Sequence, residues 1–296
     1  MAVAALDSPR SRTRAAFAAL RPRQWTKNLL LFAGLLFAAK LGDLTRWLEA
    51  LLAFCVYCAA SSAAYLVNDV RDAPHDREHP VKRLRPVASG ELPARTALGI
   101  ATVLVVLAFG GAAVLGWGSV AFLAGFLVLQ VAYTAGLKHV VLIDVLAISA
   151  LFVIRASAGA EAVDVRISPW LLICTGLLAL FLALGKRRAE LVLVGAEETP
   201  GRPVLEGYSL ALVDQLVSVV AASTVIAYSL YTFGARDSKA MMATVPFVVY
   251  GVFRYLLLLH RHDLGEEPEN VLLTDVPLIL TLVAWAATSA VILALT

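Results

Sequence analysis

Charged residues are scarce in this chain of 296 residues: they make up 16% of it, whereas hydrophobic residues make up 60%. A soluble globular domain carries about 25% charged residues, so the composition excludes a soluble cytosolic enzyme and a secreted protein. Disorder is excluded by the same values, because an aliphatic chain with few charges has ample apolar surface to bury. The formal net charge of +3 is too small to indicate a nucleic-acid partner, and we expect none.

Cysteine is rare as well. The chain has three cysteines, Cys55, Cys58 and Cys174, and all lie inside apolar runs. An odd number at such positions excludes a disulfide framework. The Cys55-x-x-Cys58 spacing would suit a redox or metal pair, but no second pair or nearby histidine accompanies it, so we interpret these residues as packing residues.

Long polar stretches are also missing. The largest, 68–94 and 187–207, are too short to fold as separate domains. We therefore expect one membrane domain over residues 1–296, with a polar N-terminal tail at 1–27.

Apolar runs of transmembrane length fill the remainder. A membrane-spanning helix needs about 20 such residues, and the pattern predicts an all-α bundle of nine transmembrane helices. The predicted spans are 28–40, 47–67, 95–116, 118–136, 140–160, 169–186, 208–234, 240–260 and 274–295.

The distribution of positive charge predicts the orientation of this bundle. Most of the 25 lysine and arginine residues lie in the N-terminal tail and in the loops after the second, fourth, sixth and eighth spans. Positively charged loops stay in the cytoplasm. The N-terminus and the segments 68–94 and 187–207 are therefore expected on the cytoplasmic side of the plasma membrane.

Three aspartates follow the second span in the segment Asn68-Asp69-Val-Arg-Asp72-Ala-Pro-His-Asp76. If the helix continues through them, their spacing places them on one face. Mg²⁺ is the economical neutraliser of such carboxylates, and it retains positions for phosphate oxygens. Asn68 can supply a neutral oxygen. The alternative is a solvated acidic face that keeps this end of the helix out of the bilayer.

Basic residues follow directly. Lys82, Arg83 and Arg85 lie between two prolines, where a continuous helix is difficult to form. Acidic residues followed by basic ones suit a metal-bridged polyphosphate, although positive-inside topology requires lysine and arginine here in any case.

A second polar cluster, which contains Lys186, Arg187 and Glu190, ends the sixth span. Lys186 and Glu190 are one helical turn apart and could simply pair. Two other segments share this side of the membrane: Tyr133 to Lys138, and Arg21 to Asn28 with Trp25 and Lys27. Trp25 could be an interfacial anchor and Lys27 a flanking charge.

Two ionisable residues lie inside the fifth span. Asp144 and Arg155 are about 16 Å apart along a helix. Each therefore requires a partner elsewhere in the bundle.

The Asn68-Asp69-x-x-Asp72-x-x-x-Asp76 pattern resembles the first aspartate-rich motif of the UbiA-type intramembrane prenyltransferase superfamily. The resemblance extends over essentially the whole chain, and it implies that Asp69, Asp72 and Asp76, with Asn68, bind Mg²⁺ and a diphosphate. A second aspartate-rich motif usually follows the sixth span. Here Lys186-Arg187-Arg188-Ala189-Glu190 stands in that place.

With this departure and its basic segments, the chain resembles the decaprenyl-phosphate phosphoribosyltransferase branch of that superfamily. The resemblance implies transfer of 5-phosphoribose from 5-phosphoribosyl 1-diphosphate to a polyprenyl (decaprenyl) phosphate, with release of diphosphate, for arabinan precursors of the cell wall. The three aspartates would be catalytic, and a cationic site fits a phosphorylated substrate. The substrate contacts would come from Lys27, Asn68, Lys82, Arg83, Arg85, Tyr133, Lys138, Lys186, Arg187 and Glu190.

Two alternatives remain. The first is a prenyltransferase that uses a prenyl diphosphate and an aromatic acceptor, and the missing second aspartate pair counts against it. The second is a polytopic transporter, which would not require an acidic triad beside a basic loop. The sequence leaves a homo-oligomer open.

Overall fold

A computed structural model describes residues 11–37, 42–78, 81–166, 168–197, 203–234, 239–261 and 274–295. Throughout these ranges the ordered elements are helices and none is a strand, so the all-α prediction is confirmed. The α-helices are α1 (Arg12–Ala19), α2 (Ala33–Phe37), α3 (Leu44–Glu78), α4 (Ala94–Leu115), α5 (Trp117–Ala135), α6 (Ile143–Ala162), α7 (Pro169–Glu197), α8 (Leu210–Gly234), α9 (Val245–Arg261) and α11 (Val276–Leu295). The 3-10 helices are η1 (Pro22–Phe32), η2 (Lys82–Leu84), η3 (Leu137–His139), η4 (Pro203–Gly207) and η5 (Lys239–Thr244).

Seven segments of the described chain are long and apolar enough to cross a membrane: α3, α4, α5, α6, α8, η5 with α9, and α11. A membrane protein is thus supported, but the predicted count of nine spans is not confirmed. The predicted span 169–186 lies within α7, which is 29 residues long and is not among the seven. The first predicted span, 28–40, corresponds to the end of η1 and to α2, and residues 38–40 lie outside the described ranges.

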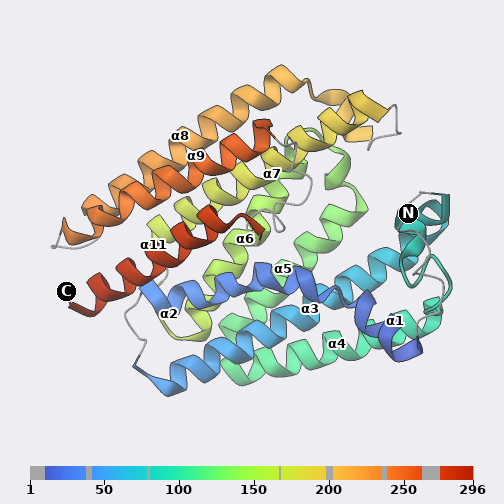
Figure 1. Cartoon of the computed structure of the whole chain (residues 1–296). Coiled ribbons are helices and arrows are strands. Elements are labelled where there is room, and N and C mark those ends of the chain that lie inside the picture. The colour runs from blue at the N-terminus through green and yellow to red at the C-terminus, as the bar shows by residue number, and fades with distance from the viewer. Residues whose placement is uncertain are drawn as a thin grey trace.

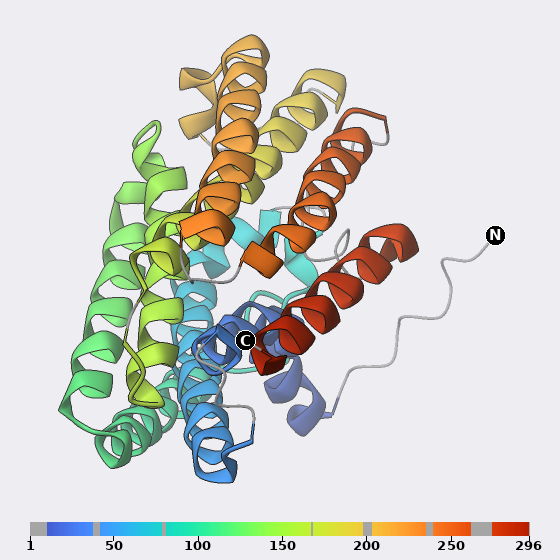
Figure 2. The same ribbon diagram turned by 90° about the vertical axis from the view of Figure 1, so that its left-hand side faces the viewer.

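The long helices run side by side as a series of hairpins (Figure 1). α3 packs against α4, α6 lies between α5 and α7, and α8 contacts both α7 and α9. α11 lies at the edge of the bundle beside α9 (Figure 2). Only 17% of the apolar stretch of each of α4, α5 and α11 is buried inside the bundle, as expected of helices that face lipid.

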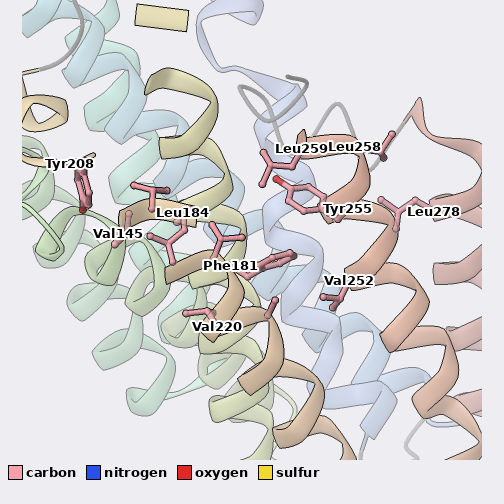
Figure 3. Packing of buried hydrophobic residues seen from close by; sticks show 14 of the residues in the cluster. Val145, Phe181, Leu184, Tyr208, Val220, Val252, Tyr255, Leu258, Leu259 and Leu278 are labelled. Atoms are coloured by element: carbon pink, nitrogen blue, oxygen red, sulfur yellow. The ribbon is translucent and has the colours of Figure 1, made fainter. Parts of the chain in front are cut away.

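The two largest apolar cores of the described chain hold the bundle together. One joins α6, α7, α8 and α9. It includes Phe181 of α7 and Tyr255 of α9, whose rings meet edge to face with centroids 5.2 Å apart (Figure 3). The other joins η1, α3, α4, α5 and α6, and it includes Tyr57 and Phe126. Because rings of this size bury a large apolar area, these contacts fix the relative positions of the helices that carry the polar residues.

η1 is the least regular part of the bundle, because 3-10 helices longer than three or four residues are uncommon and this one has 11. It contacts both α3 and α6. Its approach to α6 is very close: a Cβ atom on Gly159 would lie 2.1 Å from the carbonyl oxygen of Leu31. Only glycine fits there, so the sequence of α6 allows η1 to pack directly on its backbone.

Candidate active site

The acidic motif lies on the last turns of α3, which continues to Glu78 although Pro74 cannot donate a backbone hydrogen bond. The helix therefore continues through all three aspartates, which is the condition under which their spacing places them on one face. Asp69 and Asp76 are buried, with 1% and 5% of their surface exposed, and Asp72 is half-buried. Buried carboxylates require compensation by positive charge or hydrogen bonds.

Two arginines supply positive charge to the buried aspartates. Arg85, which follows η2, places Nη1 2.6 Å from Asp76 Oδ2 and 3.5 Å from Asp69 Oδ1. Arg21, between α1 and η1, donates from Nη2 to Asp69 Oδ1. Its guanidinium also lies over the ring of Tyr65, 4.9 Å from the centroid. These contacts join three separate segments of the chain at one point.

The other two motif residues pair with each other. Asn68 Nδ2 donates to Asp72 Oδ2 over 2.9 Å, across one turn of α3. The amide group therefore orients one Asp72 oxygen. The Asn68 side-chain oxygen is a neutral ligand of the kind that hard cations bind.

The chemistry of these donors fits magnesium. Three carboxylates and an amide oxygen occur within nine residues of one helix, and hard divalent cations prefer oxygen ligands. As the side chains lie, no three acidic, histidine or cysteine residues of the described chain gather closely enough to hold a metal ion. Asp69 and Asp76 are instead engaged by Arg21 and Arg85. The donor set is suitable for Mg²⁺, but its convergence on one ion is not seen.

The basic loop after α3 folds back against that helix. Arg77 Nε donates to the carbonyl oxygen of Ala88 over 3.2 Å, and this bond ties the loop to α3. Lys82 is half-buried and Arg83 is exposed, both on η2. The loop thus places Arg85 against the aspartates and leaves Arg83 at the surface.

The second polar cluster is built around an ion pair between α7 and α6. Arg187 Nε lies 2.7 Å from Asp144 Oδ2, and Arg187 Nη1 also donates to Glu190. The Tyr208 hydroxyl donates to Asp144 Oδ1 over 2.6 Å and accepts from the backbone N–H of Leu142 over 2.7 Å. Burial, together with the bond to Asp144, raises the pKa of Tyr208, so its hydroxyl stays protonated.

These contacts supply the partner that Asp144 was expected to need. Glu190, one helical turn from Lys186, accepts a hydrogen bond from Arg187. Tyr208 was not among the predicted site residues, and neither was Arg21 as a partner of the acidic motif. The basic opening segment gave a signal for Arg21, whereas a tyrosine at the start of an apolar run gives none.

The end of α5 links the two clusters. Arg71 Nη1 donates to the carbonyl oxygen of Thr134 over 3.3 Å. The neighbouring Tyr133 lies close enough to Arg187 to interact with it electrostatically. Both clusters therefore lie at the same end of the bundle.

Three further lysines were predicted to bind substrate. Lys27, Lys138 and Lys186 are half-buried, on η1, η3 and α7 respectively. Each of these elements contacts α6.

An acidic helix end beside several cations can bind a polyanion through a divalent metal and direct hydrogen bonds. Such an arrangement suits transfer reactions in which a diphosphate leaves.

Comparison with known proteins gives a consistent result. The pattern of the UbiA prenyltransferase family matches residues 29–274 of this chain. Decaprenyl-phosphate phosphoribosyltransferase of Mycobacterium tuberculosis (strain CDC 1551 / Oshkosh) is 37% identical over 277 residues, which cover 91% of each chain. The Corynebacterium glutamicum protein of the same name is 35% identical, over 90% of this chain and 83% of its own. A UbiA homolog from Archaeoglobus fulgidus, bound to GPP and Mg²⁺, has the same fold: the TM-score is 0.73 at 17% identity, with coverage of 95% of this chain and 100% of that one.

Proposed function

Because the chain belongs to the UbiA prenyltransferase family, we propose that it transfers 5-phosphoribose from 5-phosphoribosyl 1-diphosphate to a polyprenyl phosphate such as decaprenyl phosphate. The observation that carries this proposal is the similarity, over about nine tenths of both chains, to a relative named decaprenyl-phosphate phosphoribosyltransferase, a name that gives the acceptor and the group transferred. The acidic end of α3, with cations from three segments around it, is the site to which we assign it.

Bond making and breaking balance without a further reactant. The bond between ribose C1 and the diphosphate oxygen breaks, and a bond forms between C1 and an oxygen of the lipid phosphate. That phosphate is anionic at neutral pH, so it can attack without a general base, and in-line displacement inverts C1. The products are the polyprenyl phosphoribose and free diphosphate.

Asp69, Asp72 and Asp76, with the side-chain oxygen of Asn68, would hold Mg²⁺. When bound, the metal supplies charge neutralisation for the leaving diphosphate. The chain's own cations act beside it: Arg85 already reaches both buried aspartates from the loop, and Arg21 reaches the same oxygen of Asp69 from the segment between α1 and η1. Both are in place to donate to diphosphate oxygens that approach the metal ligands.

The remaining cations are proposed contacts of the 5-phosphate and the lipid phosphate. Lys82 and Arg83 lie on η2, and Lys27, Lys138 and Lys186 lie on η1, η3 and α7, three elements that contact α6. Arg187, buried between Asp144 and Glu190, places a fixed positive charge at the position of the family's second acidic motif. Tyr133 and Glu190 complete the proposed contacts.

We also propose the orientation that the charges predict, with the N-terminus and the site facing the cytoplasm across the plasma membrane. The N-terminal tail at 1–27 and the segments 68–94 and 187–207 would then meet the soluble substrate, while the polyprenyl tail stays in the bilayer. The product would serve arabinan and cell-wall precursor synthesis.

The test is a purified-protein assay with Mg²⁺, radiolabelled 5-phosphoribosyl 1-diphosphate and decaprenyl phosphate. We expect label in the lipid fraction, and loss of it with EDTA. Parallel reactions with geranyl diphosphate and an aromatic acceptor test the prenyltransferase alternative. Label in the prenylated aromatic product alone would overturn the proposal, and no turnover of either pair by folded protein would favour a transporter.

A further inference from the structure

Arg155 lies near the middle of α6, inside the membrane-spanning part of the bundle, with 5% of its surface exposed. Within the described part of the chain, no carboxylate pairs with it. Ionisable groups inside a membrane bundle are costly and usually serve function.

Arg155 binds η1. Its Nε donates to Asn28 Oδ1 over 2.9 Å, and its Nη1 donates to the carbonyl oxygen of Leu151 on its own helix over 3.2 Å. Its guanidinium also lies over the rings of Phe126 and Phe152, 4.7 and 5.3 Å from their centroids. The aromatic rings fix the guanidinium in place, and its directed bond to another element goes to Asn28.

Asn28 then connects α6 to α3. It is fully buried, and its Nδ2 donates to Cys58 Sγ over 3.3 Å. One turn earlier on η1, Trp25 Nε1 donates to Ser62 Oγ over 3.0 Å. The same hydroxyl donates to the carbonyl oxygen of Leu20 over 2.9 Å.

The docking residues of η1 follow its helical repeat. In a 3-10 helix there are about 3 residues per turn, so residues three apart lie above one another. Trp25, Asn28 and Leu31 form one such row, and each makes a contact with α3 or α6. The row clamps η1 between the two helices.

Arg21, at the start of η1, depends on this clamp. Its φ angle is 54°, in the left-handed region that is unfavourable for a residue with a side chain. Such a conformation persists only where the surroundings impose it. The Ser62 bonds to Leu20 and Trp25 hold the chain on both sides of Arg21, and the resulting backbone directs its side chain to Asp69.

We propose that Arg155 is a positioning residue, which acts through Asn28 to hold η1 in the register that sets Arg21 against Asp69. It touches no reacting group. Its role is to fix one cation of the diphosphate site from within the membrane. The inference rests on the proposed function only where activity or diphosphate binding is measured.

The first experiment is hydrogen exchange of the full-length protein in detergent, followed by mass spectrometry. Arg155→Met should increase exchange of amides in residues 21–32 at least about tenfold, because η1 loses its bond to α6. Exchange in α4, which carries none of the Arg155 contacts, should not change. Arg155→Lys keeps a donor for Asn28 and should restore part of the protection. The matched control is Arg254→Met, which removes another arginine of a spanning helix, paired with Asp275. It should leave residues 21–32 unchanged.

The second experiment measures binding of magnesium diphosphate by calorimetry to wild type, Arg155→Met, Arg21→Ala and the double variant. Arg155→Met and Arg21→Ala should each weaken binding about tenfold. The double variant should bind no more weakly than Arg21→Ala, because both changes remove the same contact, that of Arg21 with the diphosphate. Independent additive losses would overturn the inference, and so would wild-type exchange at 21–32 in folded Arg155→Met. If wild type binds no magnesium diphosphate, the proposed function fails, and the exchange experiment still decides the role of Arg155.

Discussion

Arg187 and Asp144 form an ion pair that water does not reach: Nε and Oδ2 are 2.7 Å apart, and the two side chains are 1% and 0% exposed. The arginine expected to contact substrate is thus part of the packed interior. Lys186, its neighbour, is half-buried. The two adjacent cations should therefore respond differently to substitution.

Lys186→Ala should lower kcat/KM about ten- to hundredfold, because a charge-assisted contact to phosphate is worth roughly 1.5 to 3 kcal/mol. The amount of inserted protein should not change. Steady-state kinetics with each substrate, normalised to inserted protein, provides the measurement. Activity within twofold of wild type would remove Lys186 from the site.

Arg187→Ala should instead destabilise the fold. It leaves Asp144 buried without its cation, and such a change costs about 3–5 kcal/mol. Tyr208→Phe removes the hydrogen bond to Asp144 and the one from the backbone N–H of Leu142, and should cost about 1–3 kcal/mol. Arg187→Lys should also lower the stability of the fold, since a point charge cannot satisfy both Asp144 and Glu190. Thermal unfolding in detergent would compare the three, and an unchanged Tm for Arg187→Ala would refute the structural role.

Asp72→Asn and Asp76→Asn should abolish turnover while the protein still folds, because each keeps its shape and loses the charge that magnesium requires. A metal ligand contributes several kcal/mol of transition-state stabilisation. Asp43→Asn, at the start of α3 and far along the helix from the motif, is the control and should retain activity. If either variant is active at ordinary magnesium concentrations, that residue is not a ligand.

Sidedness can be tested by labelling. In a background without native cysteines, in which Cys58→Ser keeps an acceptor for Asn28, Ser89→Cys should resist an impermeant maleimide added to intact cells. Asp164→Cys should react, since both positions are exposed and the charge distribution places them on opposite sides. The reverse pattern would invert the predicted topology.

Asp275 gives a prediction for pH. The hydrogen bond from Arg254 lowers the pKa of this carboxyl below its usual value. Its folded pKa is thus below the unfolded one, so the pair contributes stability above about pH 4. That contribution is lost as the pH falls through the folded pKa. The difference in Tm between wild type and Arg254→Gln should therefore be full at neutral pH and should narrow as the pH falls below about 4. A constant difference would contradict this linkage.

The positions of the long helices could be predicted from the sequence because apolar run length determines them. The predicted ends of 95–116 and 118–136 differ from those of α4 and α5 by one residue. The spacing of the aspartates likewise required only that α3 continue past the apolar run. Both inferences depend on local sequence alone.

Contacts between distant segments could not be predicted in this way. The basic opening segment marks Arg21 as a cation, but nothing in the local sequence indicates that Arg21 meets Asp69 or that Tyr208 meets Asp144. Those contacts depend on how the helices pack. The 3-10 geometry of η1 could not be predicted either, since an apolar run predicts an α-helix. In the structure this segment has a 3-10 repeat, packs against Gly159 and bonds to Arg155 through Asn28.

The repeat of η1 also matches those of its neighbours in length. Three residues of a 3-10 helix rise about 6 Å, as do four residues of an α-helix. Trp25 and Asn28 meet Ser62 and Cys58, four apart on α3, and Asn28 and Leu31 meet Arg155 and Gly159, four apart on α6. The three elements are therefore commensurate along the bundle. A single-residue insertion in η1 would put it out of step with both neighbours at once, so the length of this segment is as constrained as its composition.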